Sequence, residues 1–187
     1  MKPTKEATAL PGVWIVRPKV FGDERGFFKE NFNQKEYAEL ELPTDFVQDN
    51  ISWSRYGTVR GLHFQAPPHP QAKLVTVLYG EAVDVVLDIR RGSPTYGQHI
   101  SVPLRAQEHT QLYVPEGMAH GFAVLSPYCL FCYKVRGKYD KPSEGGVRWN
   151  DPALGIDWKI GPEEAIISEK DKILPIFEEL KTPFQYR

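Results

Sequence analysis

The chain has 187 residues, of which 41% are hydrophobic and 25% are charged, with 23 Lys and Arg against 24 Asp and Glu. This size and composition are typical of one globular domain, here residues 1–187, that buries about 70% of the surface its unfolded chain exposes. The formal net charge of −1 argues against a general binder of nucleic acid or acidic membranes, because such proteins usually carry a basic excess. Residues 1–11 lack the apolar stretch of a signal peptide, and no run approaches the roughly 20 apolar residues of a membrane span, so we expect a soluble, cytoplasmic protein.

The N-terminal part of the chain predicts two strands and a short helix. Residues 13–16, Val-Trp-Ile-Val, form a first strand, and the turn at 22–26 leads into a second strand at 27–32. A helix is predicted over about 33–40, with an Asn as its N-cap and Glu36 as the partner in a capping box.

The rest of the chain predicts short strands separated by turns. A proline-rich loop lies at 66–70, a Gly-Glu hairpin turn at 80–81, and a short helix at about 175–181 closes the chain. The predicted strands cover residues 46–54, 58–65, 73–79, 82–89, 99–104, 110–114, 121–125 and 130–135. About ten closely spaced strands with helices only at the margins favour an all-β jelly-roll sandwich or barrel, whose concave inner face is a natural pocket.

The two cysteines, Cys129 and Cys132, have the C-x-x-C spacing of redox and zinc sites. They lie, however, in an apolar strand-like run, and strand positions three apart point to opposite faces of a sheet. Free cysteines are often buried, so we interpret both as small packing residues.

Five histidines are the first candidates for chemistry. His69, His99 and His109 lie near loops or strand ends, and we expect them at the surface. His63 and His120 stand among glycines and apolar residues on predicted strands. Each of these two is either a hydrogen-bonded core residue or part of a site, and spacing alone leaves both interpretations open.

Residues 115–120, Pro-x-Gly-x-x-His, look like the second sequence motif of the cupin superfamily. Cupins that bind a metal also need a His-x-His pair and a Glu in the first motif. Here His63 is followed by Phe64 and Gln65, and Lys73 comes further on. Because zinc or iron needs at least three donors and an ammonium group repels a cation, we predict a pocket without metal that favours negative charge on its ligand.

Two further positions have alternative interpretations. Tyr133 shares a strand face with Phe131, so it points into the pocket or is an ordinary buried tyrosine with a satisfied hydroxyl. Ser168 and Asp171 have the spacing of a capping box, but Asp171 could equally orient a histidine and stabilise its imidazolium.

Taken together, segments in order along nearly the whole chain resemble the dTDP-4-dehydrorhamnose 3,5-epimerase family. The matching segments are residues 20–28, 46–50, 60–65, 73–75, 88–97, 115–122, 149–152, 156–158 and 168–171. The resemblance implies a metal-free cupin fold, no organic cofactor, and a homodimer in which strand exchange brings residues of one subunit near the other's site. It also implies a nucleotide-linked 4-keto-6-deoxyhexose as substrate, epimerised at C3 and C5 on the route to dTDP-L-rhamnose.

The resemblance also assigns roles to five residues. Both carbons to be inverted flank the C4 ketone, so a base on one face and an acid on the other are required. His63 is implied as the base, with Asp171 as its orienting partner, and Tyr133 as the acid. Lys73 is implied to stabilise the oxyanion that develops on O4, and His120 to line the sugar pocket.

The nucleotide end of the substrate calls for cations and polar groups, since an arginine fork binds two phosphate oxygens at once. The positions that match the family's binding residues are Arg25, Glu30, Gln48, Asn50, Arg60, Glu144 and Lys170. Phe28 is expected in the core, whereas packing and ligand contact both stay open for Phe27.

The chain departs from the family pattern at three places. Ile51 stands where the family often has His, Ala72 where it has Gly, and 135–138 replace a small, polar segment beside the implied acid. A single-centre epimerase, a ketoisomerase and a non-catalytic sugar-nucleotide sensor therefore remain alternatives. A metal-dependent cupin oxygenase is disfavoured because ligands are missing.

Overall fold

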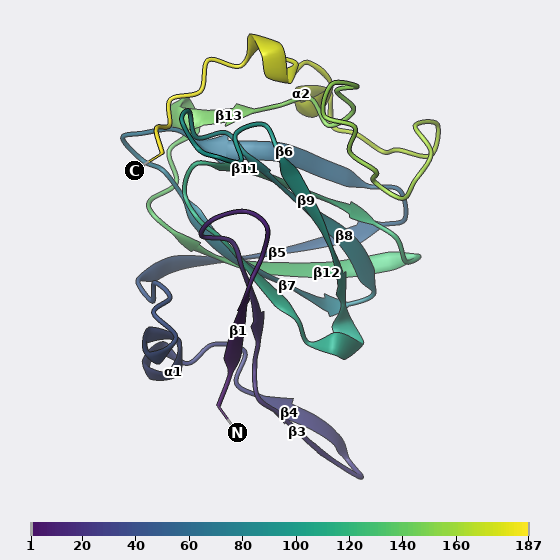
Figure 1. Ribbon diagram of the computed structural model, residues 1–187. Coiled ribbons are helices and arrows are strands. Elements are labelled where there is room, and N and C mark those ends of the chain that lie inside the picture. The colour runs from purple at the N-terminus through teal and green to yellow at the C-terminus, as the bar shows by residue number, and fades with distance from the viewer. Residues whose placement is uncertain (1, 187) are drawn as a thin grey trace.

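The computed structural model describes residues 2–186, which form two facing antiparallel sheets and a hairpin that projects from one end (Figure 1). The larger sheet contains, in spatial order, β1 (Thr4–Ala7), β2 (Trp14–Arg17), β10 (Gln111–Val114), β7 (Ala72–Tyr79), β12 (Tyr128–Arg136) and β5 (Phe46–Arg55). The smaller sheet contains β13 (Glu144–Gly146), β6 (Val59–Gln65), β11 (Met118–Val124), β8 (Glu81–Asp88) and β9 (His99–Arg105). The hairpin consists of β3 (Val20–Asp23) and β4 (Gly26–Lys29).

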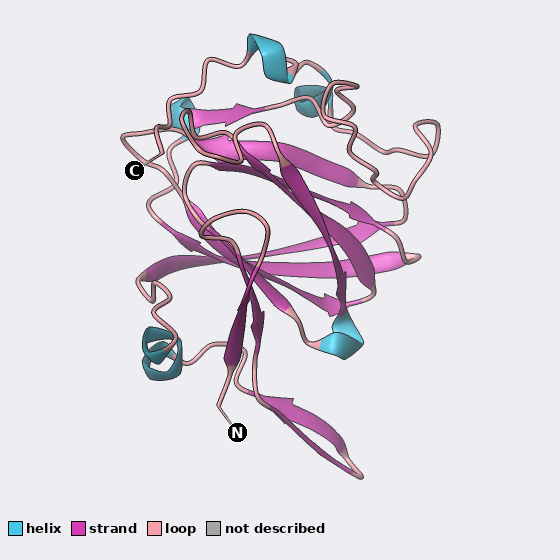
Figure 2. Cartoon of the chain, in the orientation of Figure 1, coloured by secondary structure: helices cyan, strands magenta, loops and turns pink. Residues whose placement is uncertain are grey.

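The helical segments are short and lie outside the sheets (Figure 2). Two are α-helical, α1 (Gln34–Glu39) and α2 (Glu169–Lys172). Three are single 3-10 turns, η1 (Ala106–Glu108), η2 (Lys141–Ser143) and η3 (Phe177–Glu179). The predicted all-β jelly roll with short marginal helices is therefore confirmed.

Both faces of the smaller sheet are buried. Its inner face packs on the larger sheet through a cluster that includes Val75, Val86, Leu112, Phe122 and Phe131. Its outer face is covered by the chain that follows β13, in a cluster that includes Val83, Val85, Leu87, Trp149 and Trp158. Burial on both faces explains why β8 is buried at nearly every position and carries the apolar run Val85-Val86-Leu87 instead of alternating.

Local signals predicted the first helix correctly and the last one incorrectly. Asn33 caps α1, because its side chain accepts hydrogen bonds from the N–H groups of Lys35 and Glu36. Residues 175–181 form only the turn η3, in which Phe177 packs against the outer apolar cluster. A segment this short gains too few helical hydrogen bonds to offset the cost of nucleation, so packing decides its conformation.

The projecting hairpin corrects two further expectations. The strand predicted at 27–32 ends at Lys29, and Phe28 is 67% exposed instead of lying in the core. Phe21 and Phe27 on the same hairpin are also exposed. Cys129 is fully buried, as expected, whereas Cys132 on the opposite face of β12 is only half-buried.

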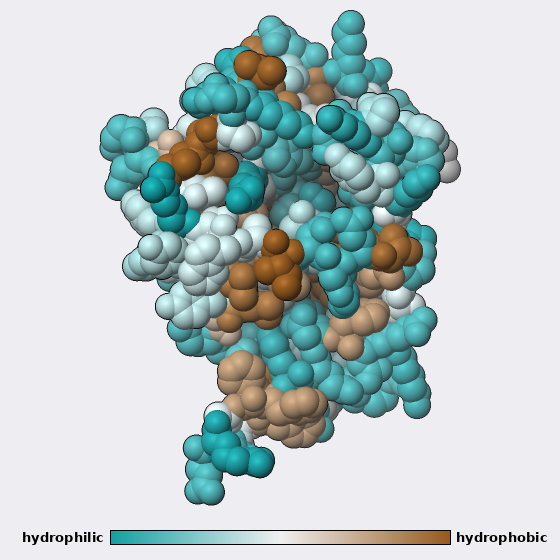
Figure 3. Space-filling model, turned by 180° about the vertical axis from the view of Figure 1, so that it is seen from behind, coloured by the Kyte–Doolittle hydropathy of each residue, from teal (hydrophilic) through white to brown (hydrophobic). Residues whose placement is uncertain are grey.

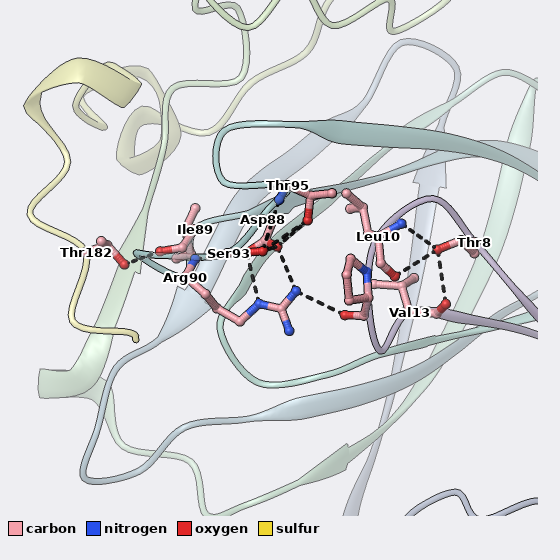
Figure 4. A network of polar contacts seen from close by, with 10 residues as sticks. Thr8, Leu10, Val13, Asp88, Ile89, Arg90, Ser93, Thr95 and Thr182 are labelled. Carbon is pink, nitrogen blue, oxygen red and sulfur yellow. Dashed lines mark hydrogen bonds and ion pairs between the residues drawn. The ribbon is translucent and has the colours of Figure 1, made fainter. Parts of the chain in front are cut away.

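A buried polar network closes the end of β8 (Figure 4). The Asp88 carboxylate accepts hydrogen bonds from the guanidinium of Arg90 at 2.7 and 2.9 Å and from the hydroxyls of Ser93 and Thr95 at 2.6 and 2.7 Å. Arg90 also donates to the carbonyl of Pro11 at 3.0 Å. The network therefore fixes the loop after β8 and ties the N-terminal segment to it.

We expect Asp88→Asn to lower the free energy of unfolding by about 3 kcal/mol, because it leaves the Arg90 guanidinium without its counter-charge in a mostly buried position. Urea denaturation measures this change. Asp157→Asn is the control, since its ion pair with Lys159 is largely exposed and should contribute little to stability. Equal losses in both variants would contradict a structural role for the network.

Candidate functional site

A cavity of about 770 Å³ lies between the two sheets. Its apolar walls come from both sheets and include Val114, Met118, Phe122 and Phe131. Ten of the twelve site residues expected from the sequence line it, namely Gln48, Asn50, Arg60, His63, Lys73, His120, Tyr133, Glu144, Lys170 and Asp171. One concave site therefore collects side chains that are up to about 120 positions apart in the chain, as expected for a jelly-roll pocket.

His63 and Asp171 form a hydrogen-bonded pair in this cavity. His63 Nε2 lies 2.7 Å from Asp171 Oδ1, and the Asp171 side chain is only 4% exposed. Asp171 stands on α2, where its backbone N–H donates to the hydroxyl of Ser168 at 3.1 Å. Half of the capping box is therefore present: Ser168 caps the turn, whereas the Asp171 carboxylate binds His63 and the N–H of Gly61.

The surroundings keep the Asp171 carboxyl ionised. Burial raises its pKa, but the bond with His63 and the N–H of Gly61, 3.4 Å from Oδ2, lower the pKa by more, so the net pKa lies below its usual value. An ionised Asp171 accepts a hydrogen bond from the N–H of His63 Nε2, which leaves Nδ1 as the nitrogen with the free lone pair.

A bulge in β6 turns two polar side chains toward the cavity. His63 pairs with His120 across to β11, but Arg60 pairs with Phe122, so β6 contains one extra residue between the two pairs. Residues three apart in a regular strand face opposite sides, yet Arg60 and His63 both line the cavity. Gly61 permits this geometry, since its φ is +132° and a Cβ there would lie 2.6 Å from the Cα of Gly121.

Lys73, His120 and Asp84 form a second buried polar chain. Lys73 Nζ lies 3.5 Å from His120 Nδ1, and His120 Nε2 lies 2.9 and 3.0 Å from the two Asp84 oxygens. Asp84 is completely buried and was missed by the sequence analysis. Its only signal was one carboxylate inside the otherwise apolar strand β8, and such a residue needs a buried partner.

Burial and charge attraction have opposite effects on the pKa values of the contacting residues Lys73 and His120. Burial lowers the pKa of Lys73 to about 8, although the negative charge of Asp84 raises it. Burial likewise lowers the pKa of His120, which favours a neutral ring. A neutral His120 that donates from Nε2 to Asp84 presents Nδ1 as an acceptor to the Lys73 ammonium.

Tyr133 lies on the larger sheet, across the cavity from the His63–Asp171 pair. It lies on β12, pairs with Asn50 of β5, and lines the cavity together with Phe131, as the shared strand face predicted. Burial raises the pKa of its phenol, whereas a hydrogen bond with Asn50 and the charge of Arg60 lower it. His63 and Tyr133 therefore approach the cavity from opposite sheets.

The mouth of the cavity is more exposed and more polar than its floor. Lys170 forms an ion pair with Glu144, whose other oxygen accepts from the hydroxyl of Tyr139 at 3.2 Å. Arg60 donates to Ser54 at 3.2 Å. Tyr139 also lines the cavity and was not singled out in the sequence, where it is one aromatic in a polar loop.

Arg25 and Glu30 do not reach the cavity of their own chain. Arg25 lies on the projecting hairpin and pairs with Asp23, and Glu30 follows β4 and accepts from the side chain of Asn33. The space-filling view shows that this hairpin combines hydrophobic atoms with a hydrophilic tip (Figure 3). The three other histidines also lie outside the cavity, but His69, His99 and His109 are half-buried instead of fully exposed.

Residues 2–186 contain neither a cluster of metal ligands nor a helix suited to span a membrane. No group of three or more His, Cys, Asp or Glu side chains comes together there in a way that could hold a metal ion. No helix in the same range combines the length and the apolar character that a membrane crossing requires.

Comparisons with known proteins point to one family. Residues 7–179 match the sequence model of the family described as dTDP-4-dehydrorhamnose 3,5-epimerase. The Salmonella typhimurium enzyme of that name is 49% identical over 92% of this chain and 94% of its own length. A Streptomyces niveus dTDP-4-dehydrorhamnose 3-epimerase is 39% identical over 88% of this chain and 80% of its own length. The crystal structure of the Legionella pneumophila dTDP-6-deoxy-D-glucose-3,5-epimerase with dTDP-4-keto-L-rhamnose superimposes with a TM-score of 0.93, at 42% identity and 99% coverage of both chains.

The contacts from Lys73 through His120 to Asp84 predict that the pKa of Lys73 depends on the charge of Asp84. We expect Asp84→Asn to lower the pKa of Lys73 below about 8, by about one further pH unit, because it removes the negative charge that favours the ammonium form. Nitrogen NMR titration of the Lys73 side chain, assigned with Lys73→Arg, measures this change. Asp88→Asn is the matched control, being a buried carboxylate on the same strand that belongs to the network outside the cavity. An unchanged Lys73 titration in Asp84→Asn would show that the two groups are not coupled.

Proposed function

The chain belongs to the dTDP-4-dehydrorhamnose 3,5-epimerase family, and we propose that its cavity converts dTDP-4-dehydro-6-deoxy-D-glucose to dTDP-4-dehydro-L-rhamnose by inverting C3 and C5. The observation that carries this proposal is the placement of a histidine–carboxylate pair on one side of the cavity and a tyrosine on the other, with Lys73 lining the same cavity. The enzyme is thus an isomerase that acts on a nucleotide-linked sugar.

The first step is removal of a proton beside the C4 ketone. His63 Nδ1 takes the proton from C3 or C5, while Nε2 remains hydrogen-bonded to Asp171. The Asp171 carboxylate holds the ring in the tautomer that leaves Nδ1 free and stabilises the imidazolium that forms. The electron pair of the broken C–H bond moves into the enolate, so negative charge develops on O4.

Lys73 stabilises that charge. Its ammonium group is buried in a cavity with apolar walls, where a cation attracts an oxyanion more strongly than it would in water. The ketone of the substrate carries only a partial charge, so the interaction strengthens as the enolate forms and lowers the barrier. His120 and Asp84 hold the ammonium group in place from behind.

The second step returns a proton from the opposite face. Tyr133 stands on the larger sheet, across the cavity from His63 on the smaller one. Protonation of the enolate carbon from the tyrosine side, after deprotonation from the histidine side, inverts the carbon. The same pair serves C3 and C5, because both carbons flank the same ketone.

The mouth of the cavity is proposed to hold the nucleotide. Arg60 and Lys170 supply positive charge for the diphosphate, and Gln48, Asn50 and Glu144 supply hydrogen-bonding groups for the rest of the ligand. These groups lie nearer the solvent than Lys73 and His120, so the sugar occupies the floor and the nucleotide the mouth.

No side chain at a position that departs from the family pattern lines the cavity, although Lys138 adjoins Tyr139 at its mouth. Ile51 is exposed on the outer face of β5, and Ala72 is buried on the face of β7 opposite Lys73. Arg136 pairs with Asp45 and Glu116 outside the cavity. Since none of these residues lines the site, we propose inversion at both carbons and treat the single-centre reaction as an outcome of the exchange experiment below.

We propose that the protein acts as a homodimer in which each hairpin reaches the partner's cavity. The hairpin exposes Phe21, Phe27 and Phe28, as expected for a surface that another chain covers. The edge of β5 has no strand beside it within residues 2–186, so it can pair with an added strand. A partner hairpin seated there would bring Arg25 and Glu30 toward the β5 residues that line the cavity.

Solvent exchange tests the reaction. Incubation of dTDP-4-dehydro-6-deoxy-D-glucose with the enzyme in deuterated water should place deuterium at C3 and C5 of the product. His63→Ala should reduce turnover by about 100- to 10,000-fold, because it removes a positioned base, whereas the control His99→Ala leaves turnover unchanged. Exchange at one carbon alone would indicate a single-centre epimerase, and ligand binding without any exchange would indicate a sensor.

Mixed dimers test the shared site. Arg25→Ala and His63→Ala chains should each be weakly active alone, but refolding them together should restore up to about one quarter of wild-type activity, because half of the dimers are mixed and each of these has one intact site. Recovery requires Arg25 to act on the partner's cavity. No recovery in demonstrably mixed dimers would place Arg25 in the site of its own chain.

A further inference from the structure

Gln65 is a buried amide that uses most of its hydrogen-bonding capacity inside the protein. It ends β6, two residues after His63, and is only 4% exposed. Its amide nitrogen donates to the carbonyl oxygens of His69 and Lys138, the latter at 2.8 Å, and its oxygen accepts from the N–H of Asp140 at 2.9 Å. A single side chain therefore joins the strand of the catalytic histidine to two separate loops.

Two of these bonds lie on either side of Tyr139 in the chain. The carbonyl of Lys138 and the N–H of Asp140 both bind the Gln65 amide, so hydrogen bonds fix the backbone immediately before and after Tyr139. The Tyr139 side chain lines the cavity mouth and donates to Glu144 at 3.2 Å. Asp140 in turn caps η2, accepting from the N–H of Ser143 at 3.1 Å, and η2 leads directly to Glu144 in β13.

Few other hydrogen bonds join the loop at 66–71 to the loop at 137–143. Residues 66–71 contain three prolines, which lack an N–H, so this loop can donate few backbone hydrogen bonds. It packs closely on the second loop, since a Cβ on Gly137 would lie 2.4 Å from the carbonyl oxygen of Pro70. Within residues 2–186, one backbone bond between Ala66 and Ser143 and a long bond of 3.4 Å from Gln71 to Gly137 also join the loops. Strand pairing of β13 with β6 and of β12 with β7 holds only the ends of the loops.

We infer that Gln65 is a positioning residue that sets the nucleotide-binding wall of the cavity by holding the backbone on both sides of Tyr139. This inference rests on the proposed function, because it takes the cavity mouth as the site of the nucleotide. Gln65 lines the cavity, but its amide is bonded to the two loops and not to His63, Tyr133 or Lys73. Its loss should therefore weaken nucleotide binding and leave the chemical step nearly intact.

The amide is the functional group that this position requires. It supplies two donors to two carbonyl groups and one acceptor to one N–H. A methionine has a similar length but provides none of these bonds, so the N–H of Asp140 and the two carbonyls would lose the partner that joins them. Gln65→Met therefore removes these three hydrogen bonds with little change in side-chain volume.

Gln111→Met is a matched control. Gln111 is also fully buried, donates to the carbonyl of Asn31 at 2.7 Å and accepts from the hydroxyl of Tyr37 at 2.6 Å. It does not line the cavity. Both substitutions should lower the thermal midpoint, but only Gln65→Met should affect the ligand.

Three measurements on the full-length enzyme test the inference. We expect Gln65→Met to raise the Kd of dTDP, measured by calorimetry, by about tenfold and to raise KM by a similar factor, while kcat falls by less than about threefold. Gln111→Met should leave all three values near those of the wild type. Amide hydrogen exchange at Asp140 should become faster in Gln65→Met alone, because its acceptor is gone.

Several results would overturn the inference. These are unchanged dTDP affinity in Gln65→Met, an equal loss of affinity in Gln111→Met, or a fall in kcat without a rise in KM. Should Gln65→Met fail to fold, Gln65→Asn keeps an amide but shortens its reach, and the same rise in KM without loss of kcat is expected. A wild-type enzyme that binds no dTDP would instead contradict the proposed function, which separates the two failures.

Discussion

The 2.7 Å contact between His63 and Asp171 is the constraint on which the rest of the site depends. It joins two segments more than 100 residues apart, and each reaches the contact through a local departure from regular structure. The bulge at Gly61 turns Arg60 and His63 into the same cavity, and the Ser168 cap aims the carboxylate of a one-turn helix. Neither device stabilises much by itself, but together they fix the ring of His63 and determine which of its nitrogens is free.

The cavity places charge where burial makes charge costly. Lys73, His120 and Asp84 lie in a row from the cavity into the smaller sheet, and the pKa of Lys73 falls to about 8 through burial although Asp84 opposes this. Well-packed apolar residues at these positions would often serve stability equally well. The arrangement is understandable as a requirement of the reaction, because a buried cation stabilises an enolate oxygen more than an exposed one does.

Sequence reasoning was most successful where the information is local or carried by a motif. Strand alternation placed Tyr133 beside Phe131 on the inner face, and the cap at Asn33 began a helix as predicted. Asp84 and Tyr139 were missed, because their importance comes from register and loop packing between distant segments. Phe28 was assigned to the core because its side chain is apolar, but the hairpin that carries it projects from the sandwich. An aromatic residue exposed on a projecting hairpin cannot be distinguished from a core residue by its side chain alone.

The central claim is that Asp171 holds His63 with its proton on Nε2 and its lone pair on Nδ1. Long-range proton–nitrogen NMR of the imidazole rings, with dTDP bound and His63 assigned by substitution, reports this directly. We predict that the neutral imidazole of His63 carries its proton on Nε2 and a lone pair on Nδ1, and that Asp171→Asn disturbs this tautomer preference. A neutral imidazole with its proton on Nδ1 in the wild-type complex would contradict the account, because the nitrogen assigned to take the sugar proton would already carry one.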